Sequence, residues 1–212
     1  MSVRPATLLS WGFMFFVLVS NYLGNVKKSE NLDKIALLEQ GILSIAILQY
    51  AIGLGLPYDK LMRWRYLDWL LTTPLLISTF YLLAKEKGYD GLLWPAIFFD
   101  VVMIVGGYFA EYPETSPISL ETREQTSTFW FVLSSIALIF IFYYIYTWND
   151  FLKNEGVDTG VLPYFFYIGW TVYGLNWLNP NPDLRQDIFS YSDLFNKGIY
   201  SLVLNKVIED NF

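Results

Sequence analysis

Charged side chains stand inside otherwise apolar stretches of this sequence, where burying a charge is costly. The clearest cases are Asp68, Asp100, Asp193 and Lys197, and Glu39 lies nearer the end of another such stretch. A charge at the centre of a membrane-spanning helix costs roughly 2.5–3.5 kcal/mol on insertion scales. Because charges at such positions destabilise a membrane protein unless they serve a purpose, we treat these residues as candidates for a function.

Asp193 and Lys197 are four residues apart, so a helix would place them on one face. Two interpretations remain open. The two residues can form a structural ion pair that offsets its own cost of burial. Alternatively, the amine of Lys197 is used covalently, because a desolvated lysine condenses with aldehydes to form a Schiff base. A protonated Schiff base needs buried carboxylates nearby, and Asp68 and Asp193 are the candidates.

A polar stripe follows the stretch that contains Asp68. Arg65, Asp68 and Thr72 are spaced by three and four residues, and Thr79 lies eleven residues beyond Asp68, in nearly the same direction around a helix. These four residues, here called the polar track, can line one path across a membrane. Packing of small polar side chains between helices is the alternative for the two threonines.

Large rings recur on a later stretch. Trp170, Tyr173 and Trp177 are spaced by three and four residues and so share one helix face. Such a face can pack in a core, or it can form the wall of a pocket for a flat, apolar ligand.

The elements that must position these residues are seven apolar stretches with short polar breaks between them. They cover about residues 7–26, 34–55, 61–84, 91–110, 127–148, 160–178 and 187–208. Crossing the hydrocarbon core of a bilayer takes roughly 20 helical residues, so each stretch can span it. The sequence therefore predicts an all-α membrane protein, a bundle of seven transmembrane helices in a single domain over residues 1–212.

Composition supports this class and argues against others. Charged residues make up 16% of the chain and hydrophobic residues 54%, whereas soluble domains carry about 25% charge. Cysteine and histidine are both absent, which argues against disulfides, zinc fingers and histidine-based catalysis, so we expect neither a metal site nor an enzyme. A net charge of −6 gives no electrostatic basis for binding nucleic acid.

Three runs carry a resemblance to a known family. The run from Arg65 to Leu75 resembles the third helix of microbial rhodopsins, and the run from Trp170 to Trp177 resembles their sixth. The run from Asp193 to Lys197 resembles their seventh helix, with Lys197 matching the retinal lysine. Further matches cover the second, fourth and fifth helices: Tyr50, Asp100, Met103, Gly107, Trp130, Ser134 and Ser135.

The resemblance implies all-trans retinal bound as a Schiff base to Lys197. It implies that Asp68 and Asp193 form the counterion pair, that Asp68 is the first proton acceptor, and that Arg65 organises charge on the extracellular side. The implied pocket consists of Tyr50, Trp69, Thr73, Met103, Ser134, Ser135, Trp170, Tyr173 and Trp177. The N-terminus is then extracellular and the C-terminus cytoplasmic, the other partners are the lipid bilayer and transported protons or cations, and homo-oligomers are common in the family.

Departures from the family pattern bear on the function. Thr79 stands where proton pumps of the family usually carry a carboxylate that returns a proton to the Schiff base. Gly174 replaces a proline of the sixth helix, and Asn196 directly precedes the lysine. A compact chain with a threonine at the donor position is similar to the rhodopsins of giant algal viruses. Without a cytoplasmic donor we expect slow reprotonation, which disfavours a fast pump.

The leading hypothesis is therefore a light-gated, channel-like conductor of cations or protons. Polar residues could hydrate a passage, although ordinary hydrogen bonding between helices is the alternative for each: Glu39, Gln40, Ser44, Gln49, Asn176, Asn196 and Asn205. A weak outward proton pump is the nearest alternative function, and a sensory photoreceptor that acts through a partner is the rival from another class. A colourless seven-helix scaffold would leave Lys197 and its two aspartates unexplained.

Overall fold

The computed structural model describes residues 5–24 and 29–212, and these residues form helices without a strand. Five long helices come first: α1 (Pro5–Gly24), α2 (Glu30–Gly53), α3 (Tyr58–Glu86), α4 (Trp94–Glu111) and α5 (Arg123–Asn154). A short 3₁₀ turn, η1 (Pro113–Thr115), lies between α4 and α5. Two interrupted helices complete the bundle, so the predicted seven-helix architecture is confirmed.

Both interrupted helices contain a π-helical segment. The sixth consists of α6 (Leu162–Tyr164), η2 (Phe165–Trp170) and α7 (Thr171–Trp177), and the seventh of α8 (Pro182–Asp193), η3 (Leu194–Ile199) and α9 (Tyr200–Asn211). Here η2 and η3 are the π-helical segments, and η3 contains Lys197. Because π-bulges occur frequently at functional sites, the segment around Lys197 is a candidate functional region.

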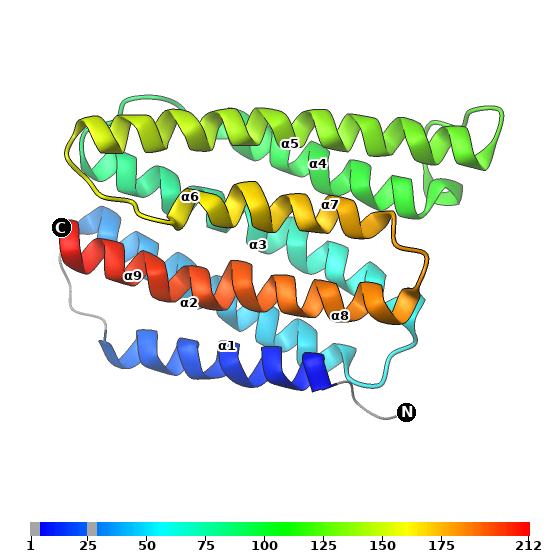
Figure 1. Cartoon of the computed structure of the whole chain (residues 1–212), viewed down its shortest axis with the longest axis horizontal. Helices are drawn as coiled ribbons and strands as arrows, with labels where there is room; N and C mark the ends of the chain where they lie inside the picture. The colour runs from blue at the N-terminus through cyan, green and yellow to red at the C-terminus, as the bar shows by residue number, and fades with distance from the viewer. Residues whose placement is uncertain (1–4, 25–28) are drawn as a thin grey trace.

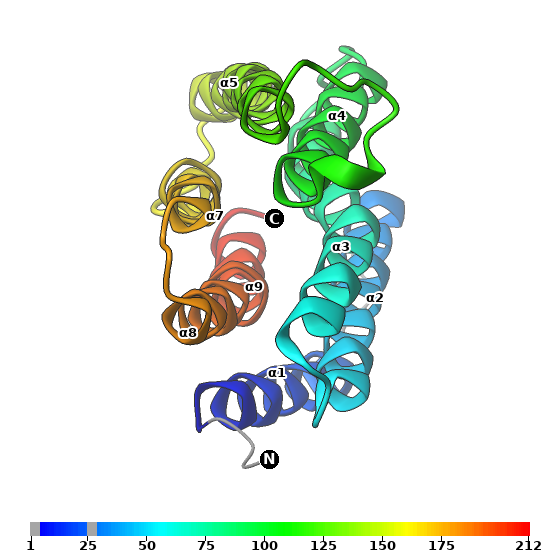
Figure 2. The same cartoon turned by 90° about the vertical axis from the view of Figure 1, so that its right-hand side faces the viewer.

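The helices run side by side and, seen along the bundle, enclose a common interior (Figure 2). The described N-terminal and C-terminal ends lie at opposite ends of the bundle (Figure 1). Among the five long helices α3 is the most buried and α5 the least. The helix that carries the polar track is therefore the central one.

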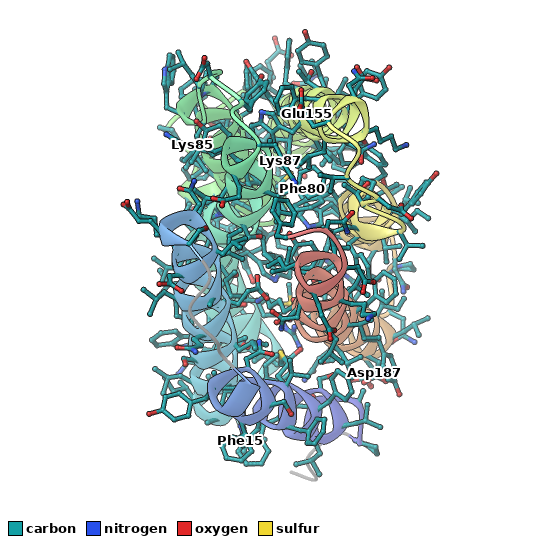
Figure 3. The ribbon with its side chains drawn as sticks, turned by 90° about the vertical axis from the view of Figure 1, so that its left-hand side faces the viewer. Phe15, Phe80, Lys85, Lys87, Glu155 and Asp187 are labelled. Carbon is teal, nitrogen blue, oxygen red and sulfur yellow. The ribbon has the colours of Figure 1, made fainter. Side chains whose placement is uncertain are left out.

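The outer surface is suited to lipid. The five long helices are long and apolar enough to cross a membrane. Figure 3 shows Phe15 pointing away from the bundle and Phe80 inside it, and Phe15 is 51% exposed whereas Phe80 is fully buried. In a bilayer such outward apolar side chains contact lipid rather than water.

Several helices extend beyond the predicted apolar stretches into the polar breaks. The first stretch ends in residues 25 and 26, which lie outside the described residues. The fifth helix starts at Arg123 rather than 127, because Thr122 accepts a hydrogen bond from the backbone of Gln125 in a capping box. It also continues to Asn154 rather than ending at 148. Apolar length measures the hydrocarbon-spanning part of a helix, whereas its caps set where the helix ends.

Candidate functional site

Lys197 lies at the centre of the bundle, in η3, with 1% of its surface exposed. Its Nζ donates a hydrogen bond to a carboxylate oxygen of Asp68 on α3. Its distance to the nearer carboxylate oxygen of Asp193, four residues earlier, is 3.8 Å. The two carboxylates expected from the sequence thus both face the amine, and the closer one comes from another helix.

Asp193 receives hydrogen bonds from four side chains. Tyr173 Oη and Trp69 Nε1 donate to Oδ1 at 2.7 and 3.1 Å, and Arg65 Nη1 and Tyr50 Oη donate to Oδ2 at 2.8 and 3.0 Å. Hydrogen bonds of this kind favour the charged form of a carboxylate. Asp193 is therefore held as a fixed anion.

Asp68 is bound quite differently. Lys197 donates to its Oδ2, while Oδ1 has no hydrogen-bond partner among the described residues. The carboxylate is also buried, with 2% of the residue exposed. One oxygen of Asp68 can therefore accept a proton, whereas both oxygens of Asp193 already accept hydrogen bonds.

Arg65 balances the charge of this cluster. It is 1% exposed, pairs with Asp193 and donates from Nη2 to Ser190 Oγ at 2.8 Å. Two cations, Arg65 and Lys197, thus lie among two carboxylates, Asp68 and Asp193. Burial of such a set is tolerable because each charge has an opposite partner within hydrogen-bonding range.

The rest of the polar track also lies inside the bundle. Thr72 and Thr79 are fully buried, but Thr72 donates to the backbone carbonyl of Asp68 at 2.9 Å rather than to its carboxylate. Thr79 Oγ1 lies 2.8 Å from the hydroxyl of Tyr200, on the seventh helix. The track therefore continues from α3 towards α9.

A cavity with about 820 Å³ of empty space, part of it open to the outside, ends at Lys197. Among the predicted pocket residues, the following line it: Trp69, Thr73, Met103, Ser134, Ser135, Trp170, Tyr173 and Trp177. Six further lining residues were not predicted from the sequence: Tyr66, Leu76, Ile104, Phe131, Leu138 and Phe189. Spacing could have found Leu76, which follows Thr73 by three residues on the face of Trp69.

Tyr50 is a correction to the predicted pocket. It does not line the cavity, and its hydroxyl instead donates to Asp193. The reason is its position on α2, since the cavity is lined by α3, α4, α5 and the sixth and seventh helices. The two predicted serines do line the cavity, but their hydroxyls donate to backbone carbonyls, Ser134 to Met103 at 2.7 Å and Ser135 to Phe131 at 2.8 Å.

The cavity fits a long, flat, apolar ligand with one reactive end. Its walls are rings: Trp177 stacks on Phe131 with centroids 4.5 Å apart, and Trp69 packs edge-on against Tyr173 at 5.0 Å. A Cβ placed on Gly174, another lining residue, would meet nothing within 4 Å, so this wall leaves room. Ionised groups gather where Lys197 lies. These features suit retinal, a polyene aldehyde that can condense with the amine.

Comparisons with known proteins agree with this geometry. The sequence model of a family described as bacteriorhodopsin-like protein matches residues 4–210. Archaerhodopsin-2 from Halobacterium sp. (strain aus-2) is 30% identical over 186 residues, which cover 81% of this chain and 68% of that protein.

Solved structures share the fold. The rhodopsin of Exiguobacterium sibiricum has a TM-score of 0.76 at 22% identity and covers 97% of this chain and 95% of its own. Halorhodopsin, a light-driven chloride pump, has a TM-score of 0.79 at 18% identity and covers 97% of this chain and 94% of its own. With the family match over nearly the whole length, these findings show that the chain belongs to the bacteriorhodopsin-like family of microbial rhodopsins.

Proposed function

We propose that this protein is a retinal-based, light-activated ion transporter of the membrane, and that it conducts protons or cations in a channel-like manner. The observation that carries the proposal is the buried Lys197–Asp68 pair beside the ring-lined cavity. We further propose that residues 1–212 form a single domain whose N-terminus is extracellular and whose C-terminus is cytoplasmic.

Proteins of this family bind retinal as a Schiff base on a lysine, and Lys197 is the lysine at this cavity. When bound, retinal supplies absorption of light and a change of shape at the lysine nitrogen. Trp69, Trp170 and Tyr173 would hold it by contact with their rings.

The two carboxylates, Asp68 and Asp193, have different roles in this proposal. Asp68 accepts the proton from Lys197 Nζ, because it is already the hydrogen-bond acceptor of that atom and one of its oxygens has no other partner. Asp193 stays ionised, because Arg65 and three further donors hold its charge. Arg65 therefore remains neutralised while the proton moves.

Channel-like conduction is supported by buried polar atoms that have no partner among the described residues. They include both carboxyl oxygens of Glu39, both amide atoms of Gln49 and of Asn196, and the hydroxyl of Thr7. An unsatisfied buried polar group costs about 1–3 kcal/mol, so each of these groups favours entry of water. They lie on α1, α2 and the seventh helix, so water there could form a conducting path. Ser44, which was predicted for the same passage, is exposed on the outer surface.

A weak outward proton pump is the second candidate, favoured by a specific observation. The acceptor Asp68 lies on α3 about one helical turn from Arg65, so a proton that passes from Nζ to Asp68 moves towards the Arg65 end of that helix. With the N-terminus outside, that direction is outward. A pump also needs a way to replace the proton from the other side.

Photocurrent measured against voltage in a cell that expresses the protein tests these functions. A reversal potential that follows the proton or cation gradient supports the channel. A current of one sign at every voltage supports the pump and contradicts the channel. Absence of any current in cells that contain coloured protein contradicts transport and favours a sensor. The variant Lys197→Ala is the control, because it removes the attachment point.

A further inference from the structure

Ser190 is a fully buried polar residue without a role in the function described so far. It lies on α8, three residues before Asp193 and seven before Lys197. A buried serine in a membrane helix is often a small packing residue that bonds to a carbonyl of its own helix. The contacts of Ser190 go instead to three other helices.

The side chain of Ser190 binds the guanidinium group of Arg65 on α3. Arg65 Nη2 donates to Ser190 Oγ at 2.8 Å, and Arg65 Nη1 donates to Asp193 Oδ2 at the same distance. Because Ser190 and Asp193 are three residues apart, one face of α8 provides both acceptors. The guanidinium is a rigid, planar fork, so contacts on two of its nitrogens fix its orientation, whereas one contact leaves it free to turn.

The backbone of Ser190 is bonded to the two remaining neighbours. Its carbonyl accepts a hydrogen bond from Ser10 Oγ on α1 at 2.8 Å, and Tyr50 Oη on α2 lies 3.4 Å from the same oxygen. The carbonyl also accepts the backbone N–H of Leu194, which is its ordinary helical partner. Ser190 therefore lies where α1, α2, α3 and α8 meet, in regular helix just before the π-helical segment that carries Lys197.

The position of Arg65 matters most after the proton has moved. In the proposed function an N–H bond at Lys197 breaks and an O–H bond forms at Asp68, so both groups become neutral. Arg65 and Asp193 are then the charged pair that remains in this cluster. If Arg65 turned away, Asp193 would be a buried carboxylate without its cation, 3.8 Å from the amine nitrogen. Its charge would draw the proton back to that nitrogen.

We propose that Ser190 is a positioning residue that holds Arg65 against Asp193 while the proton passes from Lys197 to Asp68. The proposal rests on the proposed function of light-driven proton transfer at this lysine. Ser190 is not among the described residues that line the cavity, so it acts on the amine through Arg65 and Asp193. This role accounts for a buried hydroxyl beside an arginine that already has an ion-pair partner.

Absorption spectra and flash photolysis of the retinal-loaded protein in lipid test this role. In Ser190→Ala the guanidinium loses one of its two contacts on α8, so more of the negative charge of Asp193 acts on the amine. The absorption maximum should shift to the blue. The ratio of protein with the proton on Asp68 to protein with the proton on Lys197 should fall about tenfold, which is the weight of a hydrogen bond to a charged group.

Variants that differ only at the hydroxyl sharpen this experiment. Ser190→Thr keeps the hydroxyl and should restore both the colour and the ratio. Should Ser190→Ala fail to fold, Ser190→Cys carries the test, because a thiol is a weaker acceptor of nearly the same size, and it should shift both values in the same direction as the alanine. Unchanged colour and an unchanged ratio without the hydroxyl overturn the proposal.

Ser10→Ala is the matched control. Ser10 is also fully buried, and its hydrogen bond to Ser190 is as long as that of Arg65, but it binds the backbone of Ser190 rather than the guanidinium. Ser10→Ala should lower the melting temperature and keep the wild-type colour and ratio. The same blue shift in Ser10→Ala as in Ser190→Ala would mean that Ser190 acts only by joining helices, which contradicts a positioning role.

Melting of the retinal-free protein gives an independent readout. Arg65→Gln removes the guanidinium that binds Ser190, so the combined variant with Ser190→Ala should lose less melting temperature than the sum of the two single losses. Ser10→Ala combined with Arg65→Gln should give additive losses, because Ser10 bonds to the backbone of Ser190. Additive losses for Ser190 and Arg65 contradict the proposal.

Failure of this proposal can be told apart from failure of the proposed function. If Lys197→Ala keeps the colour, the retinal assignment fails, and the melting experiment still measures whether Ser190 holds Arg65. If the wild-type protein is coloured and gives photocurrents, but Ser190→Ala keeps its colour and its ratio, only the role of Ser190 is lost.

Discussion

The amine of Lys197 donates a hydrogen bond to Asp68 on another helix. Asp193 stands four residues earlier on the same helix as Lys197, but its nearer carboxylate oxygen is 3.8 Å from the amine. The two carboxylates that face the amine are therefore not equivalent. Asp193 is saturated by donors, and Asp68 keeps one oxygen without a partner. This difference underlies the predictions that follow.

Replacing Lys197 should remove both the colour and a buried countercharge. Lys197→Ala is expected to show no visible absorption with retinal and to be destabilised by about 3–5 kcal/mol, because Asp68 is left buried without its cation. Adding Asp68→Asn should recover much of this stability without restoring colour. Absorption spectra and thermal unfolding measure the two effects.

Lys206→Ala is the control for this substitution. Lys206 lies on α9, on the same interrupted helix, but its side chain is 63% exposed and pairs with Glu209 and Asp210 at the surface. It should keep both colour and melting temperature. A coloured Lys197→Ala protein would show that another group holds the ligand.

The two carboxylates should respond differently to neutralisation. Asp68→Asn is expected to shift the absorption to the red and to block early loss of the proton from Lys197, because the nearest anion is gone. Asp193→Asn should cost more stability, since Arg65 cannot give up its charge whereas a lysine can. Spectra, flash photolysis and melting curves of both variants make the comparison, and equal destabilisation would contradict the assigned roles.

A glycine packed against the residue before Lys197 leaves no room for a side chain unless that residue moves. A Cβ on Gly169 in η2 would collide with the side-chain amide of Asn196 in η3, the residue before Lys197. Gly169→Ala should therefore lower stability by about 1–3 kcal/mol and change the absorption maximum. In an Asn196→Ala background the same change should have little further effect.

Gly174→Ala is the matched control for this experiment. Gly174 lines the same cavity from the same interrupted helix, but an added Cβ would meet nothing within 4 Å. Its melting temperature should stay near that of the wild type. A larger loss of stability in Gly174→Ala than in Gly169→Ala would contradict the packing described here.

A largely buried ion pair should stabilise the end of the bundle at which α1 begins. Arg185 on α8 donates from Nη1 to Glu111 at the end of α4 at 3.0 Å, and the side chains are only 13% and 12% exposed. Because hydrogen bonds to charged groups contribute about 1.5–3 kcal/mol, Arg185→Gln should lower stability by that amount. Arg123→Gln, at a 77% exposed side chain, should change little in the same melting experiment.

Much of the pocket could be predicted because helical spacing is a local property. Trp170, Tyr173 and Trp177 line the cavity together, as their intervals of three and four residues require. Tyr50 was assigned to the wrong surroundings, since its match to the family indicates a helix but not the direction in which that helix faces. Phe131 and Leu138 could not be predicted, because the sequence pattern of apolar residues on α5 is the same whether they contact lipid or a ligand.

By itself, the sequence determined a membrane bundle of seven helices and the lysine, aspartates and rings within it. Those conclusions follow from hydrophobicity and periodicity, which act between near neighbours in the chain. Only the tertiary structure decided that Asp68 rather than Asp193 receives the hydrogen bond of Lys197, and that Tyr50 on α2 donates to Asp193. Such choices depend on how α2 and α3 pack against the seventh helix and on the π-helical segment that carries Lys197, and no local pattern encodes that packing.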